Sequence, residues 1–423
     1  MSAEWLRRAI RDFLIREPRR FVFEPPRSLE LPQVSSADLY IHVPFCKSLC
    51  PYCPYNRVLY DAALVPPYIK AMHAEIDRYF SLLGAVEVDS IYIGGGTPTT
   101  ILDELGPILE HIRRRFRHRG IIAVETTPDD LDSENLCKLR ALGVNLLSIG
   151  VQSFDDRYLR LIGRKYRASI LRPVISNALS AGFNAVNLDL MFALPGQTTD
   201  EALADLDTAL NLGVKQVTVY PLFTFPYAAA GRHLQLQQVA FPKLSTRRQM
   251  YKAIHNDAIA HGLNRVSVWG FKKDDADRFS SVTRNHYIGI GAGAGTHLPG
   301  LFYFNTFSVA EYIRSCSENV LPVALQMSMN SEVERFFWLY WRLYETSIPK
   351  DGFARLFATD MRLKSLLSLA RGLHLLTDNG NSYVLTERGS FWIHLLQNYY
   401  ILNYIDKVWA TSMRDPWPAR VEL

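Results

Sequence analysis

The chain has 423 residues and a formal net charge of +5, with 48% hydrophobic and 21% charged residues. This composition is that of a globular protein of two or three domains, and it excludes a disordered chain. The basic excess is small and spread along the sequence, and no apolar run reaches the roughly 20 residues of a membrane span, so we expect a cytoplasmic protein that neither binds nucleic acid nor crosses a membrane.

Residues 1–38 are interpreted as an N-terminal extension. A basic amphipathic helix opens the chain, and a proline-rich stretch follows it. Charged residues interrupt the apolar ones every few positions, which leaves no apolar core for a signal peptide. We expect a surface helix, with a membrane-surface anchor as the alternative.

A regular alternation of short apolar runs and longer amphipathic runs begins at residue 39. Strands are expected at 39–43, 90–94, 121–126, 146–152, 185–192 and 216–223, and helices at 68–84, 101–116, 133–143, 169–182 and 200–213. Strands that alternate with helices at this spacing predict an α/β fold built on a parallel sheet. Six such units predict a partial (β/α)6 barrel over residues 39–300, with its active site at the C-terminal ends of the strands.

The pattern changes in residues 301–423, which we expect to form an α-rich, winged-helix-like C-terminal domain. An aromatic amphipathic helix is predicted at 332–346, a second helix at 361–376, a short strand at 383–386 and a final helix at 387–409. The domain is apolar and aromatic, which favours a lid that covers the barrel mouth and the substrate.

Three of the five cysteines, Cys46, Cys50 and Cys53, lie within eight residues directly after the first expected strand. Their spacing, CxxxCxxC, gives three thiolates that can bind three irons of a cubane cluster and leave the fourth iron open. The alternative is a zinc site, which needs four ligands, and no second cysteine pair is present. The low, odd cysteine count argues against a disulfide framework.

The motif YIHVPFCKSLCPYC at 40–53 and the motif IYIGGGTPT at 91–99 resemble those of the radical SAM (S-adenosylmethionine) superfamily. More narrowly, they resemble its oxygen-independent coproporphyrinogen III oxidase-like (HemN-like) branch. Six further motifs follow in the branch's order: VETTPDDL, GVQSFDD, IGRKY, NLDLMFALPGQT, YIGIGAGAGT and LTERGSFW. The resemblance covers about residues 39–400. It implies a radical SAM barrel, a [4Fe–4S] cluster on the three cysteines, one or two SAM molecules, and an electron donor such as flavodoxin or ferredoxin.

The resemblance also implies a set of SAM-binding residues: Tyr40, Tyr52, Gly94, Gly95, Gly96, Thr97, Glu125, Gln152, Arg164 and Asp189. Tyr40 would pack beside the cluster, Tyr52 would lie against the adenine, and the glycines with Thr97 would contact the amino group and backbone of SAM. The other four would form a polar wall next to a second SAM.

Each of these residues also has a simpler interpretation. The three glycines would suit a tight turn. The two carboxylates would suit solvated or helix-capping positions. The arginine would suit an exposed ion pair, and the tyrosines ordinary packing.

Two departures from the branch's pattern bear on function. Tyr55 stands where the oxidases have a further cysteine, and Asn285, His286 and Tyr287 match the HNxxYW motif of the heme-chaperone relatives only in part. We therefore expect a member similar to the class C methyltransferases and cyclopropane-forming enzymes. In these relatives a second SAM donates a methyl or methylene group to an sp² carbon, here of a small aromatic or tetrapyrrole substrate. The alternatives are a heme-binding chaperone-like protein and an oxygen-independent coproporphyrinogen III oxidase.

A set of aromatic residues near the end of the barrel is a candidate wall for a flat substrate: Phe223, Phe225, Tyr227, Trp269, Phe302, Tyr303 and Phe304. Packing between the two domains is the alternative for this set. No residue type or spacing singles out a catalytic base.

Overall fold

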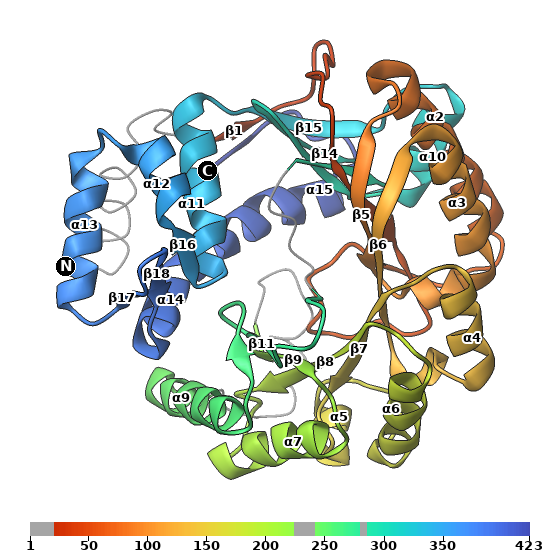
Figure 1. The fold of residues 1–423 in the computed structure, drawn as a ribbon. Helices are drawn as coiled ribbons and strands as arrows, with labels where there is room; N and C mark the ends of the chain where they lie inside the picture. Colours follow the sequence, from red (N-terminus) through yellow and green to blue (C-terminus); the bar gives the residue numbers. More distant parts are fainter. Residues whose placement is uncertain (1–20, 224–241, 280–285) are drawn as a thin grey trace.

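The computed structural model describes residues 21–223, 242–279 and 286–423, with the side chains of 399–403 left aside. The expected N-terminal helix lies outside the described residues. A mixed sheet of twelve strands forms the centre, in the order β10-β11-β9-β8-β7-β6-β5-β2-β12-β13-β14-β15. It curves into an open barrel with helices on its outer side (Figure 1). No helix among the described residues is long and apolar enough to cross a bilayer.

The six expected strands form the middle of this sheet, and every neighbouring pair among them is parallel. They are β2 (Asp38–Val43), β5 (Glu87–Gly95), β6 (Arg117–Thr126), β7 (Leu146–Gln152), β8 (Ala185–Phe192) and β9 (Gln216–Pro221). All seven residues of β7 are buried, as expected for a parallel strand covered on both faces. The predicted partial α/β barrel is confirmed.

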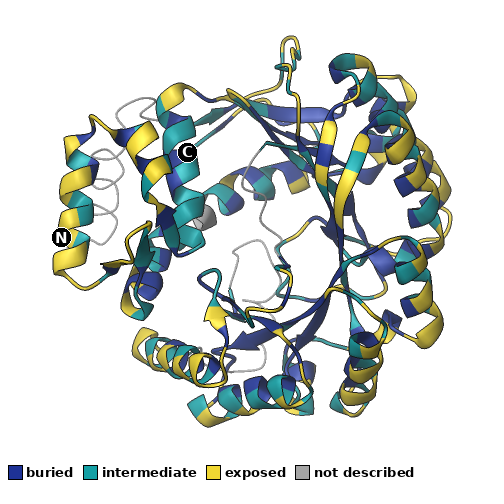
Figure 2. Ribbon diagram, in the orientation of Figure 1, coloured by how far each residue is buried: buried dark blue, intermediate teal, exposed yellow. Residues whose placement is uncertain are grey.

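The expected helices lie between these strands: α2 (Val65–Leu83), α3 (Leu102–Arg115), α4 (Ser133–Ala141), α6 (Leu171–Ser180) and α7 (Thr199–Asn211). Two further helices in the described part of residues 39–300 were not expected, the short α5 (Asp156–Leu161) and α9 (Leu244–Ala260), which packs beside α7. Buried residues follow the strands and the inner helix faces, and exposed ones follow the outer faces (Figure 2).

The sheet extends beyond the six strands at both edges. On one edge β12 (Tyr287–Ile290) pairs in parallel with β2, and β13 (Gly295–Leu298), β14 (Leu301–Asn305) and β15 (Val323–Ser328) follow in antiparallel order. On the other edge are β11 (Gly270–Lys272) and β10 (Asn264–Arg265). The expected domain boundary at 300–301 falls inside the β13–β14 hairpin, so strands of the same sheet lie on both sides of that boundary. The division into domains stays a prediction.

The predicted α-rich C-terminal region is confirmed. It contains α11 (Ser331–Tyr344), α12 (Lys350–Phe357), α13 (Met361–Gly372) and α14 (Glu387–Tyr404). A small antiparallel sheet, β16 (Ser347–Pro349), β18 (Ser382–Leu385) and β17 (Leu376–Asp378), accompanies these helices. Arg248 of α9 forms a two-point ion pair with Glu387, which ties α14 to the barrel.

A buried carboxylate joins the outer helices to the sheet. Glu75 of α2 is 1% exposed, and its oxygens accept hydrogen bonds from Gly291 N (2.9 Å), Asn305 Nδ2 (2.6 Å) and Tyr312 Oη (2.6 Å). Tyr312 belongs to α10 (Val309–Ser317). Burial raises the pKa of Glu75 to about 7, although the three donors lower it. The sequence pattern did not single out this residue, because a helix periodicity does not show which buried polar group has partners.

We expect Glu75→Gln to lower the free energy of unfolding by about 1–3 kcal/mol, because the amide NH2 would face a buried donor and leave that donor unpaired. Urea unfolding of the full chain measures the change. The control is Glu110→Gln on α3, which removes an exposed carboxylate paired only with Arg114 and should cost less than about 0.5 kcal/mol. Equal losses in the two variants would contradict the role given to Glu75.

Candidate functional site

The three clustered cysteines lie at the C-terminal end of β2, as predicted. Cys46 is in the short strand β3 (Phe45–Cys46), and the other two follow in the next loop. Cys46 and Cys50 are buried, Cys53 is half-buried, and all three thiols are free. The amide of Cys53 donates to the carbonyl of Cys50 (3.3 Å), so the loop folds back on itself.

The cysteine loop is held in place by groups other than its thiols. Its strand β3 pairs with β4 (Val58–Leu59), and Arg57 Nη2 donates to the carbonyl of Cys50 (2.6 Å). Lys47 Nζ reaches Asp130 Oδ1 (2.5 Å), whose other oxygen accepts from Thr99 Oγ1 (2.9 Å). The sulfurs are thus left for a ligand.

The thiols fit an iron–sulfur cluster better than a single zinc ion. Burial raises the pKa of Cys46 to about 11, and the charges of Cys53 and Cys50 add to it, so a bound cation would favour the thiolate of Cys46. Around a tetrahedral zinc the sulfurs would lie about 4 Å apart. Among the described residues, only one set of three potential metal ligands has its ligand atoms within 4.8 Å of one another, and it does not include these cysteines. At least one pair of the three sulfurs is therefore more than 4.8 Å apart. A cubane, whose irons occupy separate corners, suits this wider spacing.

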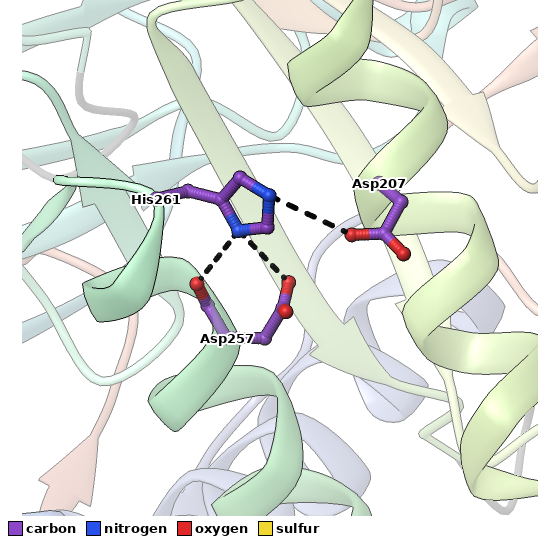
Figure 3. Close-up of side chains that lie close together, drawn as sticks. All are labelled: Asp207, Asp257 and His261. Carbon is purple, nitrogen blue, oxygen red and sulfur yellow. Dashed lines mark hydrogen bonds and ion pairs between the residues drawn. The ribbon is translucent and has the colours of Figure 1, made fainter.

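That other group is Asp207 of α7 with Asp257 and His261 of α9 (Figure 3). His261 Nδ1 lies 2.9 Å from the carbonyl oxygen of Asp257, and a carbonyl can only accept, so this nitrogen carries a proton. His261 Nε2 is 4.0 Å from Asp207 Oδ1. With one ring nitrogen used as a donor and the ring exposed, these residues form a surface ion-pair group between two helices.

The glycine-rich turn after β5 packs directly on the cysteine loop. Gly96 N donates to Val43 O (2.7 Å), Thr97 N donates to Phe45 O (2.8 Å), and Thr97 Oγ1 lies 3.6 Å from Cys46 Sγ. A Cβ on Gly96 would lie 2.7 Å from Phe45 O, so only glycine permits this approach. This close approach accounts for glycine at position 96, whereas Gly94 and Gly95 are the last two residues of β5; the expected contact of the three glycines with SAM stays a prediction.

Tyr40 begins a hydrogen-bond chain across the barrel. Its hydroxyl lies 2.7 Å from His42 Nδ1, and His42 Nε2 lies 2.8 Å from Asn56 O. Because that carbonyl can only accept, Nε2 carries the proton and Nδ1 accepts from Tyr40. Burial lowers the pKa of His42 to about 4, so the ring is neutral. Asn56 Nδ2 in turn donates to Ala292 O (3.0 Å) and Phe307 O (2.9 Å).

Glu125 and Asp189 lie in strands β6 and β8, so the helix-capping alternative is wrong. Glu125 accepts from Tyr92 Oη and, at 3.4 Å, from Gly95 N. Asp189 accepts from Ser148 Oγ (3.1 Å) and Asn187 Nδ2 (2.9 Å). Burial first, and then the charge of Glu125, raise the pKa of Asp189 to about 7. The two carboxylates are therefore close enough to act on each other inside the barrel.

Gln152, Arg164 and Tyr52 lie together on the side of β7. Gln152 ends that strand with φ of 69° and accepts from Tyr220 Oη (2.7 Å). The guanidinium of Arg164 lies over the rings of Tyr52 (5.8 Å) and Tyr166 (5.6 Å). Its Nε is buried without a hydrogen-bond partner, which corrects the exposed ion-pair alternative. A buried, unpaired donor next to a carboxamide suits an anionic or carbonyl-bearing ligand.

We expect Asp189→Asn to stabilise the protein above pH 7. The folded pKa of Asp189 is raised to about 7, so the folded state binds more protons than the unfolded state between about pH 4 and pH 7. Stability therefore falls as the pH rises through that window and is constant above it. The Ser148 hydroxyl can accept from the new amide, so this variant, unlike Glu75→Gln, leaves no donor facing a donor. It should lose this slope and gain about 1–3 kcal/mol at pH 8. Thermal unfolding between pH 5 and pH 8 tests this, with the exposed Asp200→Asn as control. A variant that kept the wild-type slope would contradict the assignment.

The structure divides the expected aromatic wall between opposite edges of the sheet, which corrects that prediction. Phe223 follows β9 and lies 6.3 Å from Trp269 between ring centroids. Phe302 and Phe304 lie in β14 and pack on Phe23, and Tyr303 of β14 is fully buried with its hydroxyl 3.0 Å from Tyr79 Oη. Phe225 and Tyr227 lie outside the described residues.

A cavity of about 340 Å³ lies at the opposite end of the barrel from the thiols, next to the first residues of β2 and β5. His286, His297 and the carboxylates of Asp38, Asp89 and Glu334 line it. His297 is 3% exposed, and its Nε2 lies 3.2 Å from Glu334 Oε2. The sequence singled out His286 but not this cavity, because His297 and Glu334 come from separate elements. Asn285 lies outside the described residues.

Three free thiols and a glycine turn at the C-terminal ends of parallel strands, with the half-buried carboxylates of Glu125 and Asp189 in the same sheet, define a site of the radical SAM class. The family model "Radical SAM superfamily" matches residues 40–209. "Heme chaperone HemW" of Bacillus subtilis (strain 168) is 30% identical over 360 residues, which cover 83% of this chain and 95% of that protein. "Oxygen-independent coproporphyrinogen III oxidase" of Bradyrhizobium diazoefficiens is 29% identical over 315 residues, 70% of each chain.

Among solved structures, coproporphyrinogen III oxidase (HemN) from Escherichia coli aligns with a TM-score of 0.74 and 21% identity, over 91% of this chain and 94% of that chain. This likeness shows a shared fold. The chain belongs to the radical SAM superfamily, in its oxygen-independent coproporphyrinogen III oxidase-like (HemN-like) branch. The cofactors of this family are a [4Fe–4S] cluster and SAM.

Proposed function

We propose that this protein is a radical SAM protein that binds heme or a closely related tetrapyrrole. The observation that carries the proposal is the 30% identity with a protein named as a heme chaperone, over 95% of that protein's length. Proteins of the same name from other bacteria are also similar to this chain, for example that of Lactococcus lactis at 28% identity. This favours the heme-binding alternative over methyl transfer.

In this proposal Cys46, Cys50 and Cys53 hold the cluster, and SAM lies between the cluster and the barrel wall. The backbone of the glycine segment would contact the amino-acid end of SAM, and Gly94 lets Glu125 lie against that backbone, because a Cβ on Gly94 would lie 2.8 Å from Glu125 Oε2. Tyr40 and Thr97 would line the end of SAM that lies beside the cluster, and Tyr52 would line the adenine end. When bound and reduced, the cluster would supply an electron that releases a 5′-deoxyadenosyl radical from SAM.

The remaining residues would set charge and orientation in the same cavity. The guanidinium of Arg164, whose Nε is buried without a partner, and the amide of Gln152 would bind polar groups of SAM, and Glu125 would bind its hydroxyl or amino groups. Asp189, held by Ser148 and Asn187, would supply a carboxyl that is half-protonated near neutral pH.

Tyr55 argues against the oxidase alternative. It follows Cys53 by two residues, where the oxidases have a further cysteine, and its ring lies 6.1 Å from that of Trp409. An aromatic side chain at this position gives the mouth of the barrel a surface for a flat ring in place of a fourth thiol.

Hemin titration of the anaerobically reconstituted full chain tests the proposal. We expect a saturable shift of the Soret band at one hemin per chain, and 5′-deoxyadenosine when SAM and a reductant are added. The matched control is the same chain unfolded in guanidinium, which keeps the composition but removes the folded site. A flat titration would contradict heme binding.

Transfer of a methyl or methylene group from a second SAM stays a prediction, and none of the named relatives above supports it. The polar wall of Gln152, Arg164 and Asp189 is the feature that motivated it. Formation of S-adenosylhomocysteine together with 5′-deoxyadenosine in the presence of a porphyrin would support it, and 5′-deoxyadenosine alone would count against it. Electron delivery by flavodoxin or ferredoxin, and a cytoplasmic location, also stay predictions.

A further inference from the structure

A buried histidine with two unpartnered nitrogens lies where α14 packs against the barrel. His394 is 4% exposed, and neither Nδ1 nor Nε2 has a hydrogen-bond partner in the described part of the chain. Buried polar side chains nearly always have partners, and an unpartnered one is costly. The other two buried histidines both have partners, His42 at both nitrogens and His297 at Glu334.

Aromatic rings from three separate elements surround this imidazole. Trp269, just before β11, meets it edge-on with centroids 4.5 Å apart. Tyr344, the last residue of α11, lies 6.2 Å away, and Phe223, just after β9, lies 6.4 Å away. His394 is therefore enclosed by side chains of both the barrel and the C-terminal region.

Tyr344 links this enclosure to residues around the thiol site. Burial raises the pKa of Tyr344 to about 12, and the charge of Asp189 adds to this increase. Tyr55 of the cysteine loop also lies within the electrostatic reach of Tyr344. A ligand held at His394 would thus lie on the side of Tyr344 that faces Asp189 and Tyr55.

An unpaired cation accompanies the histidine. Arg247 of α9 is half-buried, and no hydrogen bond or ion pair of its guanidinium occurs among the described residues, whereas the next residue, Arg248, is paired with Glu387. Burial, and then the charge of Arg247, lower the pKa of His394 to about 3, so its imidazole stays neutral at physiological pH. A neutral imidazole binds metals, and a free guanidinium binds carboxylates.

We propose that His394 is the axial metal ligand, and Arg247 the carboxylate anchor, of a metallated tetrapyrrole bound between α14 and the barrel. The inference rests on the proposed function and adds the place and the two anchoring residues. Histidine is a common axial ligand of heme iron, and Trp269, Tyr344 and Phe223 supply faces for a flat macrocycle. The cavity lined by His286 and His297 is less suitable, because its three carboxylates would repel the propionates.

Because the imidazole is nearly fully covered, binding must move α14 or one of the covering rings. The helix has a feature suited to such a change, since it continues into a π-helical turn at Ile405–Trp409. Turns of this kind are rare and occur mostly at functional sites.

The test is hemin titration of the cluster-loaded full chain, followed by difference absorbance and by the electron paramagnetic resonance of the ferric heme. Wild type should show a histidine-ligated ferric heme. His394→Leu should lose this signature and bind hemin about tenfold or more weakly, since one metal–ligand bond is gone. Its melting temperature should stay equal or rise, because an apolar side chain of similar volume replaces an unpartnered polar one.

The matched control is His255→Ala, which removes a half-buried histidine of α9 that lies beside Phe271. This variant should keep the signature.

Two further measurements make the outcome specific. Added imidazole should restore the ligated spectrum in His394→Ala. Arg247→Gln should weaken binding of hemin but not of hemin dimethyl ester, whereas Lys252→Gln, which removes an exposed charge from the same helix, should change neither. If wild type binds hemin and His394→Leu keeps the wild-type spectrum and affinity, the inference is overturned and the proposed function stands. If wild type binds no hemin, both fail.

Discussion

Replacement of Cys50 by alanine is expected to reduce bound iron and SAM cleavage to background. Only three thiols are available in the loop, and with one removed a cubane keeps two protein ligands, too few to hold it against loss to solvent. The fold should survive, because β3 and β4, Arg57 and Lys47 anchor the loop without using its sulfurs. Iron and sulfide analysis after anaerobic reconstitution, with 5′-deoxyadenosine quantified by chromatography, measures the effect.

The control for this variant is Cys137→Ala, which removes an exposed thiol of α4 far along the chain from the loop. It should bind the wild-type amount of iron. A Cys50→Ala protein that kept its cluster and its activity would show that the three-thiol site is assigned to the wrong residues.

The second large effect is expected for Gly95→Ala. Gly95 has φ of 108°, and a Cβ there would lie 2.6 Å from the His42 ring, which is fixed between Tyr40 and Asn56. The strained backbone and the overlap together should cost about 2–4 kcal/mol of unfolding free energy. The displaced turn should also abolish SAM-dependent formation of 5′-deoxyadenosine, because its backbone lies against the cysteine loop.

Denaturant unfolding and the SAM cleavage assay check the Gly95→Ala result together. Gly372→Ala at the end of α13 is the matched glycine control, because no atom lies within 4 Å of its Cβ position and its φ is ordinary. It should be neutral or stabilising by about 0.5–1 kcal/mol. A Gly95→Ala protein with normal stability would mean that the turn is less constrained than its contacts indicate.

The barrel could be predicted from sequence because its strands are buried on both faces. The runs at 146–152 and 185–192 coincide with β7 and β8 to the residue. The expected strand at 216–223 ends two residues earlier, at Pro221, opposite Phe192, the last residue of its neighbour β8. The seventh parallel strand, β12, was missed because its glycine-rich sequence also suits a turn, and its pairing with β2 joins segments far apart in the chain.

For the candidate site, sequence predicted which residues gather but not how they are held. The thiols follow the C-terminal end of β2, and Glu125 and Asp189 lie in β6 and β8 of the same parallel sheet; their joint role in binding SAM stays a prediction. The supporting pairs, such as Lys47 with Asp130 and Tyr92 with Glu125, join residues from separate strands and loops and leave no local pattern. His394 was missed for a related reason, since a histidine on the apolar face of a helix is indistinguishable from a packed one until its partners are known.

Mössbauer spectroscopy of anaerobically reconstituted, 57Fe-labelled wild type, with and without SAM, tests the assignment of the cluster most directly. Three protein thiols per cubane leave one iron for SAM, so we predict a [4Fe–4S] spectrum in which one of the four irons changes its parameters when SAM is added. A spectrum of four irons that SAM leaves unchanged, or a preparation with zinc and no sulfide, would contradict it.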